Sequence, residues 1–288
     1  CSRASRDSVE LYLQDDMQLG QWNVLPGLRW QHDSGFGQQL TPKINAYRPL
    51  WQAGEQALSL RIGAGRGYRV PNLKERCYVF DHSHLGYRII GNEDLQPEFS
   101  DSYQLAWIYR LGRRHDVELG LFHNRLKDLI EYPLAGTDNG IAIYQYNNIE
   151  RALTEGLELN WQYRPGSRLR WQNGYTWLRA IDKTSGERLA QRPRHQFKSV
   201  LDARLAAGLQ MTLVGRWQSD EYNGSDAADS PAWGSLDVRL NQRLAGFLTL
   251  YAGINNLNNV QRDFSDQYDN RPVEGRLVYI GFTLERQE

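Results

Sequence analysis

The sequence predicts an all-β protein, a transmembrane antiparallel β-barrel, and three features of the chain support this fold class. Apolar and polar residues alternate along most of the chain with a period of two. The connecting segments alternate between short turns with glycine and longer polar loops. The alternating runs extend over about 10 to 14 residues, longer than the usual soluble strand of about 5 to 6, and this length fits a tilted membrane crossing.

The alternation marks the expected strands along the chain. In the run 157–163, Leu, Leu, Trp and Tyr occupy one face, and Glu, Asn and Gln occupy the other. Successive side chains of a strand point to opposite faces, so alternation over this length indicates strands with one apolar face. The same pattern recurs at 9–14, 58–63, 103–109, 197–205, 236–240, 248–254 and 278–284.

The connections form two sets. Tight hairpin turns are expected at 19–20, 53–54, 111–112, 165–166, 207–208 and 245–246, each with a glycine. Longer loops are expected at 32–38, 67–98, 133–140, 181–192, 222–231 and 258–274. Short turns on one side and long extracellular loops on the other are typical of outer-membrane barrels.

A large soluble β-sandwich or propeller is the alternative to a barrel. Charged and amide residues occupy one face strand after strand, while Leu and Trp occupy the other. A soluble core would not bury the polar face and expose the apolar one. A barrel wall with lipid outside and a wet or plugged lumen inside fits this pattern.

Composition narrows the class of partner. The chain has 34 basic and 34 acidic residues, so its net charge gives no electrostatic basis for binding nucleic acid. It has 16 Tyr and 9 Trp, whose rings carry a polar atom and suit water–lipid boundaries.

The number of expected strands suggests a larger barrel. We expect about thirteen strands, whereas antiparallel closure of a single-chain bacterial barrel normally needs an even number. The chain opens on Cys1 without an initiator Met. We therefore expect residues 1–288 to be the C-terminal portion of a barrel whose other strands lie upstream.

The segment 67–98 is the longest interval without a clean strand pattern, and it holds two of the six histidines. Its apolar residues are too many for a disordered linker. Long irregular segments of ordered domains are usually functional, so we expect a structured extracellular loop that carries function.

The two segments at the ends of this loop, Gly67–Glu75 and Gly91–Leu105, resemble the paired barrel motifs of TonB-dependent outer-membrane receptors. Three more segments resemble motifs of the same family in the same order: Asn147–Leu159, Gly253–Asn259 and Gly275–Phe282. Together they cover the chain from about residue 60 to its end.

The resemblance implies a 22-stranded barrel occluded by an N-terminal plug, of which this chain would supply the last thirteen strands. It implies a location in the outer membrane of a Gram-negative bacterium, in contact with lipid, and a TonB complex that acts on the plug and its TonB box. We expect the chain to carry no plug. The implied function is receptor-mediated active uptake of an iron chelate, either a siderophore or heme, without catalysis and without an intrinsic cofactor.

The resemblance also suggests candidate ligand residues. Heme receptors of the family place a histidine between these two motifs, where this chain has His82 and His84. A neutral imidazole is a good axial ligand of heme iron, and in an extended loop the two histidines would share one face. Tyr78 and Tyr87 would add a stacking surface or a phenolate, and Arg69 at the loop's root completes the candidate set.

Other readings stay open at this point. Histidines of surface loops are mostly solvated, and the family also takes up other chelates, cobalamin and glycans. An outer-membrane enzyme would need a nucleophile motif, which the sequence around His82 and His195 does not contain. A passive porin is less favoured because of the long apolar loop.

Cys1 and Cys77 both fall on the expected external side and are a candidate disulfide, provided that their Cα atoms come within about 6 Å. An upstream partner for Cys1 is the alternative.

Overall fold

The computed structural model describes residues 5–205, 208–224, 228–261 and 274–284. These residues form a 14-stranded antiparallel sheet and a separate 4-stranded sheet. Without β2 (Met17–Leu19), which pairs only with β3, the large sheet is a path of thirteen strands in chain order. The path runs through β1 (Ser8–Gln14), β3 (Trp22–Asp33), β4 (Gly37–Ala53), β5 (Gln56–Arg69), β8 (Glu98–Leu111), β9 (His115–Glu131), β12 (Asn147–Tyr163), β13 (Leu169–Asp182), β14 (His195–Arg204), β15 (Leu209–Gln218), β16 (Trp233–Ala245), β17 (Leu248–Asn255) and β18 (Leu277–Leu284).

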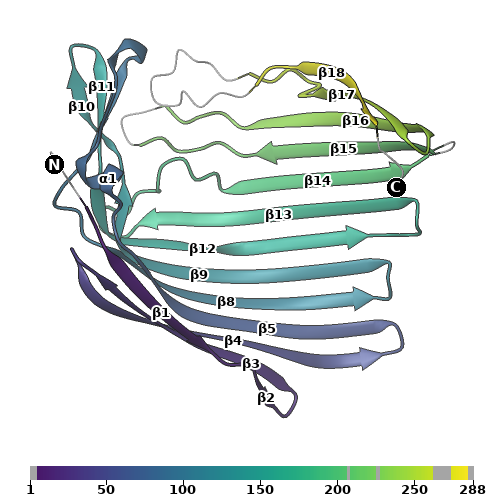
Figure 1. The fold of residues 1–288 in the computed structure, drawn as a ribbon, viewed down its shortest axis with the longest axis horizontal. Coiled ribbons are helices and arrows are strands. Elements are labelled where there is room, and N and C mark those ends of the chain that lie inside the picture. The colour runs from purple at the N-terminus through teal and green to yellow at the C-terminus, as the bar shows by residue number, and fades with distance from the viewer. Residues whose placement is uncertain (1–4, 206–207, 225–227, 262–273, 285–288) are drawn as a thin grey trace.

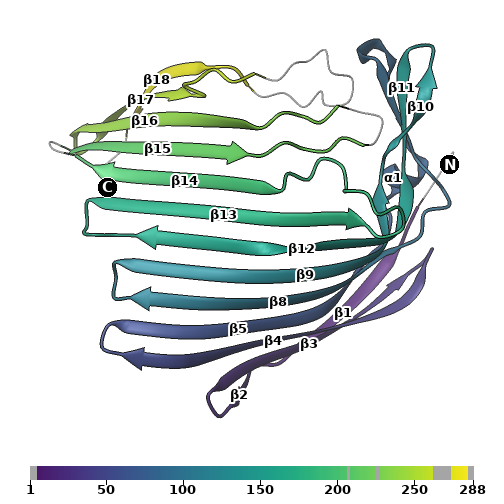
Figure 2. The ribbon, with the colours of Figure 1, turned by 180° about the vertical axis from the view of Figure 1, so that it is seen from behind.

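The large sheet is a curved wall whose strands lie side by side from β1 to β18 (Figures 1 and 2). The short turns lie at one end of the strands and the long connections at the other. The predicted antiparallel order and the predicted number of about thirteen strands are confirmed. The assignment of residues 1–288 to the C-terminal portion of a larger barrel stays a prediction.

The helical segments α1 (Leu73–Cys77) and η1 (Ser83–Leu85) are both short. Neither is long and apolar enough to cross a membrane.

The register of the sheet places polar and apolar side chains on opposite faces. Residues directly opposite each other in paired strands point to the same face. One row across the wall is apolar and runs through Leu119, Leu159, Tyr175, Phe197 and Trp217. The next row is polar and runs through Glu118, Asn160, Gly174, Lys198 and Arg216.

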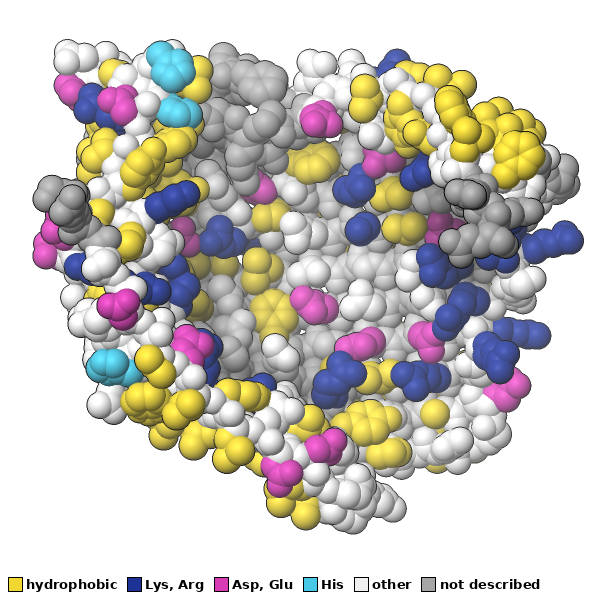
Figure 3. Space-filling model, viewed as in Figure 1, with side chains coloured by type: hydrophobic (Ala, Val, Ile, Leu, Met, Phe, Trp, Pro, Cys, Tyr) yellow, Lys and Arg dark blue, Asp and Glu magenta, His cyan; other side chains and the backbone are white. Residues whose placement is uncertain are grey.

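In a barrel of this kind, one face of the wall contacts lipid and the other lines the lumen. Phe197 is 41% exposed and Trp217 is 44% exposed, which is costly in water and favourable in lipid. Figure 3 shows that the concave face of the wall is hollowed and that charged side chains are spread across it. The predicted assignment of the charged and amide residues to one face and the large apolar residues to the other is therefore confirmed.

The short turns follow from glycine at positions where the backbone turns left-handed. Gly20 and Gly54 have φ of 61° and 57°, and Gly112 has 55°. Residues with a side chain rarely adopt this backbone conformation, whereas glycine does so without strain. These turns connect β2 to β3, β4 to β5 and β8 to β9.

Gly156 allows β12 and β13 to pack closely at the centre of the wall. A Cβ added there would lie 2.0 Å from the carbonyl oxygen of Trp177 and 2.7 Å from the ring of Phe122. The carbonyl belongs to the backbone of the neighbouring strand, so it cannot move without disturbing the ladder. Only glycine fits this position.

We predict that Gly156→Ala lowers the stability of the folded barrel by about 1–3 kcal/mol, the usual cost of overpacking. The measurement is the fraction of heat-modifiable, folded protein in outer membranes, as a function of urea concentration. Gly215→Ala is the matched control, because an added Cβ at that strand glycine meets nothing within 4 Å. Equal stability of the two variants would contradict the packing argument.

Candidate functional site

The connection from β5 to β8 begins with a capped helical turn. The side chain of Asn72 accepts a hydrogen bond from the Glu75 N–H at 2.9 Å, and the Glu75 carboxylate accepts one from the Asn72 N–H at 2.7 Å. This reciprocal capping box satisfies two N–H groups that the start of a helix leaves unpaired. It fixes the direction in which the chain leaves the barrel wall.

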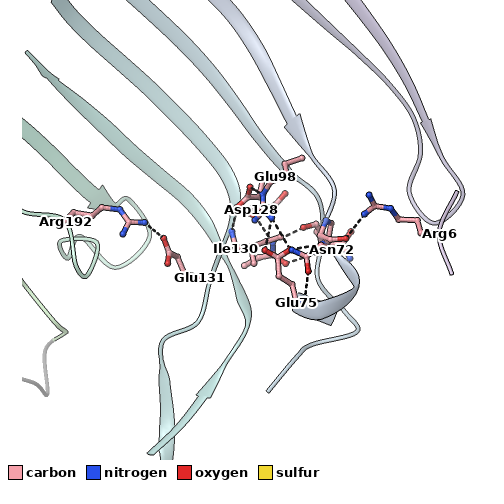
Figure 4. A network of polar contacts seen from close by, with 12 residues as sticks. Arg6, Asn72, Glu75, Glu98, Asp128, Ile130, Glu131 and Arg192 are labelled. Carbon is pink, nitrogen blue, oxygen red and sulfur yellow. Dashed lines mark hydrogen bonds and ion pairs between the residues drawn. The ribbon is translucent and has the colours of Figure 1, made fainter. Parts of the chain in front are cut away.

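Arg69 is the centre of a charged junction at the start of this connection, which we call the root junction. Figure 4 shows its two carboxylate partners, Glu75 and Glu98. Its guanidinium donates to both oxygens of Glu75, at 2.7 and 3.0 Å, and it also pairs with Glu98. The second oxygen of Glu98 accepts a hydrogen bond from the Ile130 N–H at 2.7 Å. The junction therefore joins the end of β5, the start of α1, the start of β8 and the end of β9.

Arg6 extends the contacts at this rim to the first strands. Its guanidinium donates to the Pro71 carbonyl at 2.9 Å and lies 3.1 Å from a carboxylate oxygen of Asp33. The Asp33 side chain is fully buried, and a buried carboxylate needs a partner of opposite charge. The start of the long connection is thereby held against the end of β3.

Asn148 ties the next connection, between β9 and β12, to the same root. Its side-chain oxygen accepts from the Gln96 N–H at 2.8 Å, and its NH₂ group donates to the Gln96 carbonyl at 3.0 Å. The NH₂ group also donates to the carbonyl of Asp128 at 2.6 Å. Gln96 and Asn148 both come from segments that resemble family motifs, and their physical role here is to join the two loops.

The two connections continue into one shared sheet. This 4-stranded sheet has the order β10 (Leu134–Asp138), β11 (Ile141–Gln145), β7 (Tyr87–Ile90) and β6 (Val79–His82). β11 and β7, which come from different connections, pair in parallel. Figure 1 shows this loop sheet at the loop end of the wall.

The segment that appeared irregular in the sequence thus contains a helix, two strands and a 3₁₀ turn. β6 turns into β7 through η1. Asp81 accepts hydrogen bonds from the N–H and the hydroxyl of Ser83, and these bonds lower the pKa of the Asp81 carboxyl. Gly86 closes the turn with a φ of 86°. The backbone at His84 is therefore a turn and not the extended conformation in which His82 and His84 would share one face.

The turn still brings together five ring side chains. The His82 and His84 rings lie 5.4 Å apart, and the His82 Nδ1 atom lies 3.0 Å from the Tyr87 hydroxyl oxygen. Phe80 packs on His82 with ring centroids 4.0 Å apart, and Tyr78 lies next to Phe80 at 6.0 Å. We call Tyr78, Phe80, His82, His84 and Tyr87 the tip cluster.

The structure thus gathers four of the five candidate ligand residues at one place. Phe80 completes the group, and its signal in the sequence is the alternation Tyr78, Phe80, His82. Arg69, the fifth candidate, lies in the root junction with two carboxylates, so a role in ligand binding stays a prediction. In the part of the chain that the structure describes, no three His, Cys, Asp or Glu side chains converge as a metal site.

Cys77, the last residue of α1, is disulfide-bonded. Its predicted partner Cys1 lies outside the described residues, so the pairing stays a prediction. Most of the predicted loop 258–274 also lies outside them.

Glu131, at the end of β9, carries a perturbed carboxyl beside the root junction. It accepts a hydrogen bond from Arg192 at 2.8 Å (Figure 4). Burial raises the pKa of Glu131 above its ordinary value of 4.5, against the opposing effect of Arg192, and the nearby Glu98 raises it further. Protonation of Glu131 thus occurs at a higher pH in the folded protein than in the unfolded chain.

The polar face of the wall forms a hollow of about 620 Å³ nearer the short turns. Its lining carries both signs of charge, from Arg110, Asp116, Glu118, Arg164 and Lys198. Such a mixed surface fits a polar occupant of the lumen.

We predict that Glu98→Ala loosens both loops, because it removes a partner of Arg69 and the acceptor of the Ile130 N–H. Loss of one partner from a mostly buried hydrogen-bonded group costs about 1–3 kcal/mol. Limited trypsin digestion should then cleave faster after Arg76 and Arg88. Glu150→Ala is the control, since Glu150 is an exposed carboxylate 3.6 Å from Arg151, and unchanged cleavage in Glu98→Ala would refute the anchoring role.

A second prediction concerns pH. Because the pKa of Glu131 is raised in the folded state, the folded protein binds more protons above pH 4.5, and stability falls as pH rises from 4.5 through the raised pKa. The thermal midpoint of the loops should therefore decrease as the pH rises from 4.5 through the raised pKa, and Glu131→Gln should flatten this dependence. If the thermal midpoint instead rises with pH over this range, and Glu131→Gln abolishes that rise, the raised pKa of Glu131 is contradicted.

Comparison with known proteins agrees with this fold. A family model described as "TonB dependent receptor-like, beta-barrel" matches residues 2–257. The ferric enterobactin receptor of Pseudomonas aeruginosa is 27% identical over 294 residues, which cover 89% of this chain and 38% of the receptor. The heme/hemopexin utilization protein C of Haemophilus influenzae is 25% identical over 187 residues, which cover 57% of this chain and 26% of that protein.

A crystal structure of the Pseudomonas aeruginosa ferric enterobactin receptor superimposes with a TM-score of 0.77 at 23% identity, over 98% of this chain and 45% of the receptor. The chain therefore spans less than half the length of the relatives that it matches. The family model covers most of the chain, and the curved antiparallel wall has the expected architecture. The chain belongs to the TonB-dependent receptor family, as a β-barrel segment.

Proposed function

We propose that the protein is an outer-membrane receptor of a Gram-negative bacterium for TonB-dependent uptake of an iron chelate. The observation that carries the proposal is the family match over residues 2–257, together with relatives named as receptors for ferric enterobactin and as a heme utilization protein. These relatives are named as receptors or for heme utilization, and the proposed function includes no catalysis.

The geometry is suited to this role. The apolar face of the wall would contact lipid, and the polar hollow would hold a plug domain through which the TonB complex acts. The loop sheet stands at the opposite end of the strands, where a chelate arrives from outside (Figure 1). Because the root junction joins both loops to the wall, ligand binding at the loop sheet would be transmitted to the rim of the lumen.

A ferric siderophore of the enterobactin type is the first candidate ligand, because two relatives that match 89% and 78% of the chain are named as ferric enterobactin receptors. Uptake of cobalamin, another metal complex or a glycan would use the same architecture and is distinguished by direct binding.

Heme is the second candidate, and the tip cluster is the observation that favours it. If the His82 Nδ1–H donates to the Tyr87 oxygen, the Nε2 atom of His82 carries a lone pair that can ligate iron. Phe80 at 4.0 Å and the exposed Tyr78 would provide apolar ring surface for a porphyrin.

The test is equilibrium binding and uptake with the receptor expressed from its complete gene. Ferric enterobactin, hemin and cobalamin are compared, and we expect saturable binding of a ferric chelate with a dissociation constant of about 1 µM or tighter. Uptake should stop when TonB is deleted. Saturable binding of none of the iron complexes, or uptake that continues without TonB, would refute the proposal.

For heme we predict that His82→Ala weakens hemin binding at least tenfold and changes the absorption spectrum of the bound heme. His115→Ala is the control, because His115 lies at the turn end of the wall against Tyr163. Hemin binding that is unaffected by His82→Ala would remove His82 from the site, and absence of hemin binding to the wild type would exclude heme.

A further inference from the structure

A small arginine-lined pocket lies where the connection between β13 and β14 folds back onto the wall. Leu189 of this connection packs on Ala152 and Ala180 in a buried apolar cluster. This contact fixes the connection against the C-terminal end of β13. The pocket between them has a volume of about 210 Å³.

Four of the eight lining residues are arginines, namely Arg179, Arg188, Arg192 and Arg194. Trp177 also lines the pocket. No aspartate or glutamate is among the lining residues that the structure describes. A guanidinium is always charged, and its planar set of N–H groups matches the oxygens of carboxylates and phosphates. The pocket therefore offers only positive charge to whatever enters it.

The carboxylates that balance these charges lie outside the lining. Glu155 pairs with Arg179 at 2.7 Å, and Glu131 pairs with Arg192 at 2.8 Å. Each of these two arginines has further N–H groups besides those that contact its partner. The two pairs hold the guanidinium groups in place without closing the pocket.

The other two arginines are less completely paired. Arg188 lies 3.7 Å from Asp220, and its Nη2 atom is buried without a hydrogen-bond partner. The guanidinium of Arg194 has no hydrogen bond or ion pair with any residue in the described ranges. A buried donor without an acceptor is costly, and an anion in the pocket would satisfy it.

We propose that this pocket is an oxyanion-binding subsite, which takes a carboxylate, catecholate or phosphate group through Arg188 and Arg194. Two sources of such a group meet at the external end of an outer-membrane barrel. One is an anionic ferric chelate, and this source rests on the proposed uptake function. The other is a phosphate of the lipopolysaccharide that surrounds the barrel.

The choice of variants follows from the ion pairs. Removal of Arg179 or Arg192 would leave Glu155 or Glu131 without its partner, so these residues are kept. The test variant is Arg188→Gln with Arg194→Gln, which removes two charges and retains the polar side chains. Lys183→Gln, which removes one positive charge, is the control, because Lys183 belongs to the same connection and does not line the pocket.

The measurement is made on the receptor expressed from its complete gene and purified in detergent, with two readouts. The first is the dissociation constant for ferric enterobactin at low and high salt. The second is the lipopolysaccharide phosphate that copurifies. We expect the double variant to weaken chelate binding at least tenfold and to reduce its salt dependence, whereas Lys183→Gln leaves both unchanged. Arg194→Lys should retain part of the affinity.

The outcomes separate this inference from the proposed function. If chelate affinity is unchanged but bound lipopolysaccharide falls in the double variant, the pocket is a phosphate subsite for lipid. If both readouts equal those of the wild type, the subsite is refuted while the uptake function stands. If the wild type binds no ferric chelate, the uptake function fails, and the lipopolysaccharide readout alone decides whether the pocket binds an oxyanion.

Discussion

The junction of Arg69 with Glu75 and Glu98 is the interaction on which the external part of the structure depends. It lies where two barrel strands end and two loops begin, and Glu98 adds a hydrogen bond to the backbone of β9. A guanidinium with two carboxylates is a strong, directional contact when partly removed from water. Glu98 is only 14% exposed, so the junction is partly desolvated, and the loops inherit their orientation from the rigid wall.

In the rest of the molecule, charged and apolar side chains lie on different surfaces. The net charge of the chain is zero, yet its charged groups are not evenly spread. They line the hollow face of the wall and the rim, while the other face presents aromatic and aliphatic side chains. Among the described residues of the rim, most arginines are matched with carboxylates, whereas Arg188 and Arg194 in the pocket are incompletely paired. A receptor for an anionic cargo would need such incompletely paired positive charge outside the lumen.

The wall could be predicted from the sequence because its determinants are local. A strand with lipid on one face and polar contents on the other must alternate, and residues 157–163 show that alternation without interruption. The limits of the long connection were also predictable, since Arg69 and Glu98 lie within motif segments. The tip cluster could also be predicted, because its residues are close in sequence.

The pairing of β7 with β11 could not be predicted. These strands are short and about fifty residues apart, and parallel pairing between two loops leaves no periodic signal in either. The partners of Arg69 likewise come from 6 and 29 residues away, so the sequence marked Arg69 without revealing what it contacts. The arginine pocket depends on the fold-back of Leu189 onto β13, which is a tertiary contact. In each case the missing information is which distant segments meet.

The two loops are expected to behave as one body fixed to the wall. Hydrogen–deuterium exchange of the receptor tests it directly at the two loop-to-loop bonds, from Ala142 N–H to Gly86 and from Tyr146 N–H to Ile90. If the loops are one body, the amides of residues 87–90 and 141–146 open with the same free energy. Opening free energies that differ between the two segments by more than about 1.4 kcal/mol, a factor of ten in exchange rate, would contradict it.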